Sequence, residues 1–309
     1  MIITRLIGGL GNQLFQYATA RRLAHHLEVP LKLDISGFTT YYTLRTYSLH
    51  YFNIIEDFAS PQDLRLVKKS YISELKHPKK LLKETVSELK DPEYRKSLFR
   101  PKKSITLIKE YSHSFNPEII TLPDNVYFDG YWQNENYFKD IEEIIRNEFK
   151  LKVPPDPLNE KIGQTITETE SVSIHVRRGD YVCNPLARLT HGLCSLDYYQ
   201  KAIDEIVCKI DKPHFYVFSD DPEWTKVNIK FTYPADYISH NGTSKGYEDL
   251  RLMSLCKHHI IANSSFSWWG AWLGSNDNSV IIGPSPWFNI LGHNDSDIMP
   301  ESWIRIKAN

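Results

Sequence analysis

Short apolar runs alternate with amphipathic segments through the second half of the chain, and this alternation limits the fold more than any other feature. The expected strands cover residues 171–176, 214–219, 258–263 and 279–283. The expected helices cover residues 196–210, 246–257 and 266–274, with Ser195 as an N-cap of the first. Strands that alternate with helices form parallel sheets through right-handed crossovers. The sequence therefore predicts an α/β fold with a doubly wound parallel sheet.

The first half opens with the same kind of unit. A strand is expected at 2–7, then a glycine turn at 8–12, a helix at 13–27 and a second strand at 31–35. A later strand at 126–131 precedes a helix at 140–150. Residues 153–157 contain three prolines, which cannot continue a helix, and are the best candidate linker. We expect two α/β domains, 1–152 and 153–309, that face each other across a cleft.

Bulk properties exclude several classes of protein. A net charge of −1 over 309 residues gives no field that would attract nucleic acid. None of the four cysteines has C-x-x-C spacing, no apolar run reaches the ~18 residues of a membrane span, and the N-terminus lacks a signal-peptide layout. We therefore expect a cytoplasmic protein. Residues 65–103 carry 13 Lys and Arg against 5 Asp and Glu, which indicates a solvated basic face or, alternatively, a contact with an anionic membrane or glycolipid.

The hexapeptide from His175 to Asp180, His-Val-Arg-Arg-Gly-Asp, follows the expected strand at 171–176. Ligands of open α/β sheets bind at the carboxyl ends of strands, and arginine offers a planar fork of donors that matches phosphate oxygens. Arg177 and Arg178 therefore suggest a diphosphate clamp that needs no metal. A structural Arg–Asp network around Asp180 explains the hexapeptide equally well.

The glycine turn Gly8-Gly9-Leu10-Gly11-Asn12 lies between a strand and a helix, where a phosphate or sugar can approach the backbone. It is not the dinucleotide fingerprint, because Leu14 occupies the position of the third glycine. This failure also argues against a nucleotide-sugar oxidoreductase or epimerase. Taken alone, the segment indicates a tight strand-to-helix turn with no ligand slightly more than it indicates a ligand site.

Two further blocks end strands of the second half. Asp220 and Asp221 suggest one functional carboxylate, for a metal, a ribose hydroxyl or guanine, and one helix cap, with Asp220 as the candidate cap for the segment from Pro222. The run Asn263-Ser264-Ser265-Phe266 provides small hydroxyls and free N–H groups at a helix start, a neutral cradle for phosphate. Three tryptophans follow, Trp268, Trp269 and Trp272. We expect them to pack into the core, with a nucleobase or sugar platform as the alternative.

No residues form a convincing metal site. Asp295-Ser296-Asp297 matches the short D-x-D pattern of metal-dependent glycosyltransferases, but three residues match easily by chance and no strand is expected around them. His113 and His191 lack partners at ligand spacing. We therefore expect neither a metal nor another cofactor.

Together, the blocks at 8–18, 175–181, 218–221 and 261–273 resemble the α-1,2-fucosyltransferases of glycosyltransferase family 11 in their bacterial form. The resemblance runs from residue 2 to about residue 285. It implies a GT-B-like fold, GDP-β-L-fucose as donor, a terminal β-galactoside as acceptor, inversion at the anomeric carbon and no metal. A bacterial member without a membrane anchor would be cytoplasmic or peripheral to the inner membrane.

The resemblance also implies roles for individual residues. Arg177 would contact the β-phosphate, and Arg177, Asn12 and Asp180 form the implied catalytic set. Asn12 with Gly9 and Gly11 would face the cleft near the donor sugar and the acceptor. The implied donor-binding residues of the second half are His175, Arg177, Arg178, Asp220, Asp221, Asn263, Ser264, Ser265 and Phe266. Guanine would be read by Asp221 or Asp220.

Three questions stay open at this point. The general base is unassigned, with Asp129 and Glu135 as candidates beside a dissociative route in which phosphate takes the proton. Another linkage or donor is the main alternative within the transferase class. A non-catalytic relative that binds a GDP-sugar or a glycan is the alternative outside it, although the intact Arg177 and Asn263–Ser265 blocks argue against decay.

Overall fold

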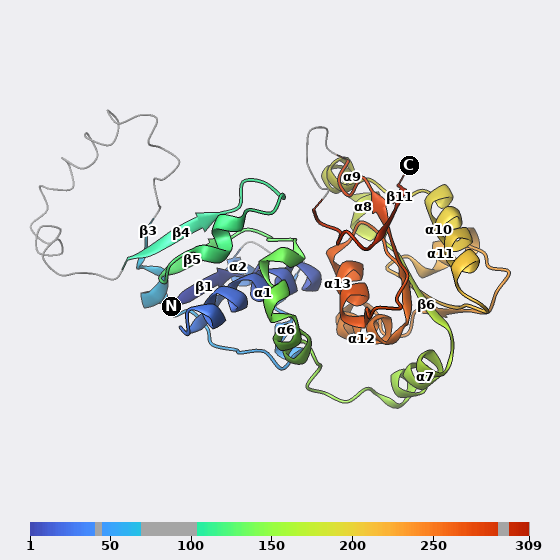
Figure 1. Cartoon of the computed structure of the whole chain (residues 1–309), viewed down its shortest axis with the longest axis horizontal. Coiled ribbons are helices and arrows are strands. Elements are labelled where there is room, and N and C mark those ends of the chain that lie inside the picture. The colour runs from blue at the N-terminus through green and yellow to red at the C-terminus, as the bar shows by residue number, and fades with distance from the viewer. Residues whose placement is uncertain (41–44, 69–103, 290–296, 309) are drawn as a thin grey trace, which may run out of the picture.

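The computed structural model describes residues 1–40, 45–68, 104–289 and 297–308. These residues form two separate parallel sheets, one from each half of the chain (Figure 1). The first has the strand order β2-β1-β5-β4-β3, and the second has the order β11-β10-β9-β6-β7-β8. All the paired strands are parallel. The arrangement confirms the predicted α/β, GT-B-like fold.

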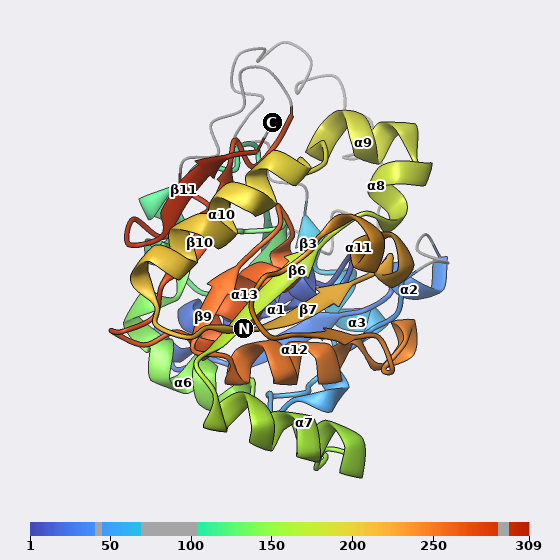
Figure 2. The ribbon, with the colours of Figure 1, turned by 90° about the vertical axis from the view of Figure 1, so that its right-hand side faces the viewer.

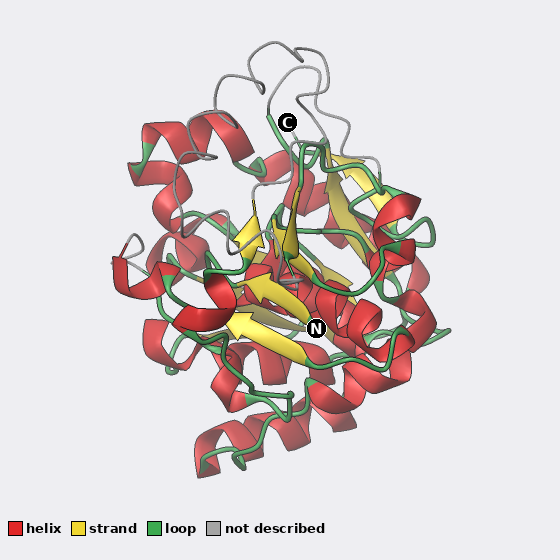
Figure 3. Cartoon of the chain, turned by 90° about the vertical axis from the view of Figure 1, so that its left-hand side faces the viewer, coloured by secondary structure: helices red, strands yellow, loops and turns green. Residues whose placement is uncertain are grey.

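The strands of the first sheet are β1 (Ile2–Arg5), β2 (Leu31–Asp34), β3 (Val67–Lys68), β4 (Ile105–Lys109) and β5 (Val126–Asp129). Its helices are α1 (Leu10–His26), α2 (Gly37–Thr40), α3 (Pro61–Leu64) and α6 (Glu142–Glu148). Figure 3 shows these strands from the side of the first half. Apolar residues of α1 cover one face of the sheet, and a smaller cluster that includes Leu64 covers the other.

The strands of the second sheet are β6 (Ser171–Val176), β7 (His214–Ser219), β8 (Ala235–Ile238), β9 (His258–Ile260), β10 (Ile281–Ser285) and β11 (Ile304–Lys307). Its helices are α7 (Pro157–Glu168), α8 (Gly179–Cys183), α9 (Pro185–His191), α10 (Leu196–Lys209), α11 (Pro222–Asn228), α12 (Gly246–Leu255) and α13 (Ser265–Gly274). Figure 2 shows this half. Side chains of β7 alternate between a cluster with α10 and a cluster with α7 and α12, so helices cover both faces.

Several predicted boundaries were wrong for local reasons. Helix α1 begins at Leu10 instead of residue 13, because Gly9 is its N-cap and Gly11 lies inside its first turn. Strand β9 ends at Ile260, because the Ser264 N–H donates to the Ala262 carbonyl and turns the chain toward α13. Pro157 begins α7 instead of ending the linker, and the Asp156 side chain accepts from the Asn159 N–H as its N-cap.

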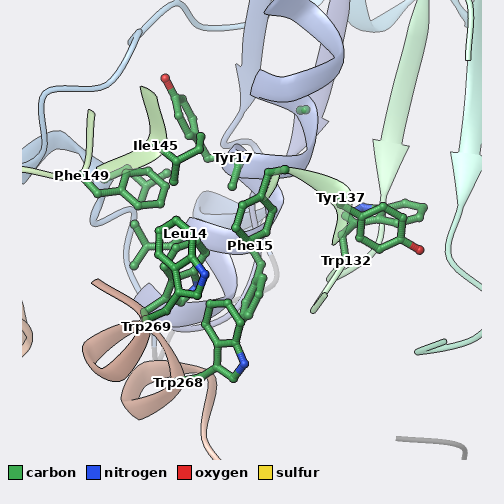
Figure 4. Close-up of a cluster of buried hydrophobic side chains, with 14 of the residues drawn as sticks. Leu14, Phe15, Tyr17, Trp132, Tyr137, Ile145, Phe149, Trp268 and Trp269 are labelled. Carbon is green, nitrogen blue, oxygen red and sulfur yellow. The ribbon is translucent and has the colours of Figure 1, made fainter. Parts of the chain in front are cut away.

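The two halves share one hydrophobic core at the contact of α1 and α13, which lie side by side between the sheets (Figure 1). The ring of Phe15 on α1 lies 4.5 Å from Trp268 and 4.9 Å from Trp269, measured between centroids (Figure 4). Trp268, Trp269 and Trp272 are buried, which confirms the core interpretation; the platform alternative was wrong. Whether 1–152 and 153–309 are independent domains stays a prediction.

No helix in the described ranges combines the length and the apolar character that a membrane crossing requires. The basic segment predicted at 65–103 lies, from residue 69 on, outside the described residues.

Candidate functional site

Arg177 follows the carboxyl end of β6, a strand in which all six residues are buried. Its guanidinium lies between two carboxylates. Nη2 donates to Asp180 Oδ1 at 2.5 Å, and Nη1 lies 2.8 Å from Asp220 Oδ2. The side chain is one-fifth exposed, so the guanidinium is held in place but still reaches solvent. A guanidinium fixed in this way can bind an anionic ligand without first losing side-chain freedom.

Arg178 has a separate set of partners. Its backbone N–H donates to Asp220 Oδ1 at 2.8 Å, and its Nε donates to Asp221 Oδ2 at 3.1 Å. The guanidinium carbon lies 3.5 Å from the ring centroid of Trp224, a cation–π contact that sequence reasoning missed. The structural Arg–Asp network was therefore a correct interpretation of the hexapeptide, and it includes Asp220 and Asp221 as well as Asp180.

Gly179 makes room for this network. A Cβ at Gly179 would lie 2.4 Å from Asp220 Oδ2. No side chain fits there without moving the carboxylate that holds Arg177 and the backbone of Arg178. Asp220 is thus the carboxylate that organises both arginines.

One of the two aspartates is the predicted helix cap, but it is Asp221 and not Asp220, because Asp221 directly precedes Pro222, the first residue of α11. Its Oδ1 accepts from the Trp224 N–H at 3.3 Å at the start of α11. The assignment leaves Asp220 as the other member of the pair. Which of them contacts a nucleotide base stays a prediction.

Replacing Asp221 by alanine is expected to lower the free energy of unfolding by about 1 kcal/mol, the usual cost of losing an N-cap oxygen. Asp221→Asn keeps a capping oxygen and should lose less. Urea unfolding followed by circular dichroism measures both. Equal losses in the two variants would contradict the capping role and assign the effect to the ion pair with Arg178.

His175 lies inside β6, with 4% of its surface exposed. Its Nδ1 is buried without a hydrogen-bond partner in the described structure, and its ring lies 5.6 Å from that of Phe266. Burial lowers the pKa of His175 to about 4, so the ring is neutral at physiological pH. That His175 borders a bound nucleotide, as the resemblance implies, stays a prediction.

The residues around the start of α13 divide into two buried ones, Asn263 and Ser264, and two partly exposed ones, Ser265 and Phe266. Asn263 is buried, and its amide donates to the carbonyls of His191 at 2.6 Å and Trp287 at 3.3 Å. This side chain fixes the loop, so we exclude it from the proposed donor site. Ser264 is the N-cap of α13 without a side-chain capping bond, and Ser265 and Phe266 begin the helix.

The glycine turn meets the same helix start from the first half. A Cβ at Gly11 would lie 2.4 Å from the backbone carbon of Ser265, so this glycine allows α1 and α13 to touch. Gly9 has no neighbouring atom within 4 Å of the Cβ position and remains open to a ligand. Asn12, the residue after Gly11, accepts a hydrogen bond from Ser265 Oγ at 2.6 Å. The turn is thus both a packing feature and the edge of the candidate site.

Arg45 is a site residue that sequence reasoning missed. Its Nη2 lies 3.2 Å from Asp180 Oδ2, so Asp180 is shared between an arginine of each half. Nothing local predicts this pair, because the partners are 135 residues apart. With Arg45 counted, three arginines face the three aspartates Asp180, Asp220 and Asp221.

The candidate bases are engaged elsewhere. Asp129 pairs with Arg5 at 3.0 Å, and Glu135 pairs with Lys139 at 3.3 Å and accepts from Trp272 Nε1. Glu110, which sequence reasoning missed, accepts from two backbone N–H groups in the turn after β5, and burial raises the pKa of its carboxyl. None of these three carboxylates lies among the contacts of Arg177 described above.

Three of the residues considered for metal binding, Asp297, His191 and His113, make hydrogen bonds or ring contacts with other groups. Asp297 accepts from the Phe115 N–H at 3.2 Å, and Asp295 lies outside the described residues. His191 stacks on Tyr181, and His113 lies against Phe288. Within the described part of the chain, no three His, Cys, Asp or Glu side chains are grouped as metal ligands.

Comparison with known proteins gives one family. The model of glycosyl transferase family 11 matches residues 1–307. An α-1,2-colitosyltransferase of Escherichia coli is 36% identical over 318 residues, 99% of each chain. The O-antigen biosynthesis glycosyltransferase WbnK of the same species is 32% identical over 97% of this chain and 99% of its own.

Two further matches either cover a smaller share of the chain or have a lower sequence identity. Human galactoside α-(1,2)-fucosyltransferase 1 is 27% identical over 186 residues, 56% of this chain and half of its own. A crystal structure of the NodZ α-1,6-fucosyltransferase soaked with GDP-fucose covers 88% of this chain and 91% of its own, with 16% identity and a TM-score of 0.47.

Proposed function

We propose that this chain, which belongs to glycosyltransferase family 11, transfers L-fucose from GDP-β-L-fucose to the 2-hydroxyl of a terminal β-galactoside. The observation that carries the proposal is Arg177, fixed by Asp180 and Asp220 at the end of β6. The relatives named as α-1,2-glycosyltransferases support the linkage. The name of WbnK supports a bacterial surface glycan as the acceptor.

In the proposed reaction, the bond between the anomeric carbon of fucose and the β-phosphate oxygen breaks, and its electron pair stays on that oxygen. The acceptor hydroxyl forms the new bond from the opposite face, which inverts the anomeric configuration. Arg177 meets the charge that grows on the leaving diphosphate, with N–H groups at the start of α13 and Arg178 as further donors. Because Asp129 and Glu135 are engaged in ion pairs, we propose the dissociative route, in which the diphosphate departs before the new bond is complete and takes up the hydroxyl proton through solvent.

A second donor deserves a direct comparison, because one full-length relative is a colitosyltransferase. Colitose is fucose without its 3-hydroxyl, so GDP-colitose and GDP-fucose would present the same diphosphate to Arg177. A site that hydrogen-bonds the 3-hydroxyl discriminates strongly against the deoxy sugar, whereas an apolar site discriminates weakly.

The test is a panel of GDP-sugars, GDP-fucose and GDP-colitose first, assayed against lactose and other β-galactosides, with the product examined by NMR. We expect an α-fucosyl unit on the 2-hydroxyl of galactose. A β-fucoside would overturn the single displacement, and an α-1,3 product would overturn the acceptor assignment alone. GDP binding without transfer or donor hydrolysis would favour the non-catalytic alternative.

Transfer is expected to continue in EDTA, because arginine side chains supply the positive charge that a metal provides in other glycosyltransferases. The measurement is the initial rate before and after chelation, followed by addition of Mn²⁺ or Mg²⁺. Complete loss on chelation, restored by either ion, would contradict the metal-free mechanism and direct attention to Asp295 and Asp297.

A further inference from the structure

Asn12 joins two parts of the first half to the start of α13. Its Oδ1 accepts from Gln133 Nε2 at 2.9 Å and from Ser265 Oγ at 2.6 Å. The three side chains come from α1, from the turn after β5, and from the first residue of α13. The separation in sequence is 121 residues for one bond and 253 for the other.

The turn that carries Gln133 is fixed from both sides. Glu110 accepts from the N–H groups of Tyr131 at 2.6 Å and Trp132 at 3.0 Å, and Trp132 has a φ of +57°, uncommon for a bulky residue. On the other side, the fully buried Asn134 donates to the Asp297 carbonyl at 2.9 Å. Gln133 itself is 8% exposed, so its amide has little freedom to leave Asn12.

These contacts determine which end of the Asn12 amide is available. An amide oxygen has two lone pairs, and both are used by the two donors. The Nδ2 group has no partner in the described part of the chain, and it lies beside Gly8, where a Cβ would come within 2.7 Å of it. Asn12 is partly exposed, so its two N–H bonds are the free hydrogen-bonding groups of this side chain.

We propose that Gln133 and Ser265 are positioning residues that hold the Asn12 amide with its N–H groups toward the substrate. Asn12 would then donate to an oxygen of the bound GDP-sugar or of the acceptor. The inference rests on the proposed function and adds a residue of the first half, Gln133, that contacts no substrate. On this proposal residue 12 has to be an amide, because a group with oxygens alone would offer no donor.

The first test separates the two ends of the amide. Asn12→Asp keeps an oxygen for Gln133 and Ser265 but removes the N–H groups. We expect kcat to fall by about 100-fold, because a donor is lost and a negative charge faces an anionic substrate, with an unfolding midpoint close to wild type. Retention of more than about a third of kcat would overturn the proposal.

The second test asks whether Gln133 acts through Asn12. Gln133→Met is close in shape and lacks the donor, and we expect kcat to fall by about tenfold with KM changed much less. In the Asn12→Asp background, the same substitution should lower kcat no further. Equal losses of kcat in the two backgrounds would show that Gln133 acts independently of Asn12 and would overturn its positioning role.

Thermal unfolding of wild type, Asn12→Leu, Gln133→Met and the double variant gives a readout that does not need activity, because leucine removes the oxygen to which Gln133 donates. Coupled effects on the unfolding midpoint support the Gln133–Asn12 hydrogen bond, and additive effects overturn it. A wild-type protein that transfers none of the GDP-sugars would instead overturn the proposed function, and the role of Asn12 toward a substrate would fall with it.

Discussion

Arg177→Ala is expected to lower kcat for transfer by at least about 100-fold while the protein remains folded. One donor aimed at a leaving group in a catalytic site contributes about 3–4 kcal/mol to the barrier. The fold should persist, because Asp180 still faces Arg45 and Asp220 still accepts from the Arg178 N–H. Initial rates with GDP-fucose and lactose, together with the circular dichroism spectrum, measure the two parts of this prediction.

Arg177→Lys distinguishes a fork of donors from a simple positive charge. A lysine ammonium lacks the planar fork of arginine and cannot contact Asp180, Asp220 and a phosphate together. We therefore expect this variant to be severely impaired as well. Arg21→Ala is a suitable control, since Arg21 forms a similarly enclosed ion pair with Glu148 in the first half. A Lys variant with more than about a tenth of wild-type kcat would argue against bidentate phosphate contact.

The main strands of the second sheet were predictable because their signals are local. Residues 171–176 alternate Val, Ile and Val with Ser and His, residues 215–218 are continuously apolar or aromatic, and the structure has strands at both places. Two short strands were missed because their sequences carry no such local signal. β8 has four residues, two of them polar or aromatic at the sheet edge, and β11 alternates Ile with Arg and Lys, so neither produces an apolar run.

The candidate site was predicted in part. The arginines and aspartates that lie close along the chain could be placed at strand ends, and the capping role of one aspartate followed from Pro222. The partners that fix them were not accessible, because Arg45 meets Asp180 through tertiary structure alone. Gln133 was missed for the same reason: the pattern around it contains no strand or helix that would direct it toward Asn12.

The resemblance implies that Gly11 faces the cleft near the donor sugar and the acceptor, and a glycine turn at a helix start is also a feature of phosphate sites. The structure instead places Gly11 inside the first turn of α1, against the backbone of Ser265 and Phe266. A glycine that allows two helices to approach and a glycine that allows a ligand to approach have the same sequence signature. Only the identity of the neighbouring group separates them, and that neighbour is 254 residues away in the chain.

Gly11→Ala is therefore expected to destabilise the protein, by about 2–3 kcal/mol in the free energy of unfolding. In an open helix the same change would stabilise, since alanine is favoured over glycine by about 1 kcal/mol. Here the new methyl group would lie 2.4 to 2.6 Å from backbone atoms of Ser265 and Phe266, and backbone cannot rotate away as a side chain can. The helices must separate, which loosens the packing of Phe15 against Trp268 and Trp269.

Gly9→Ala is the matched control, because it places the same methyl group two residues earlier, where no atom lies within 4 Å. Its cost should stay below about 1 kcal/mol, the usual range for a change at an N-cap. Urea unfolding of the two variants beside wild type gives the comparison. If Gly11→Ala proved as stable as wild type, α1 and α13 would not be in backbone contact, and the shared core would have to form in another way. If it is destabilised as expected, the activity should fall with it, because the displaced Ser265 is one of the two donors to Asn12.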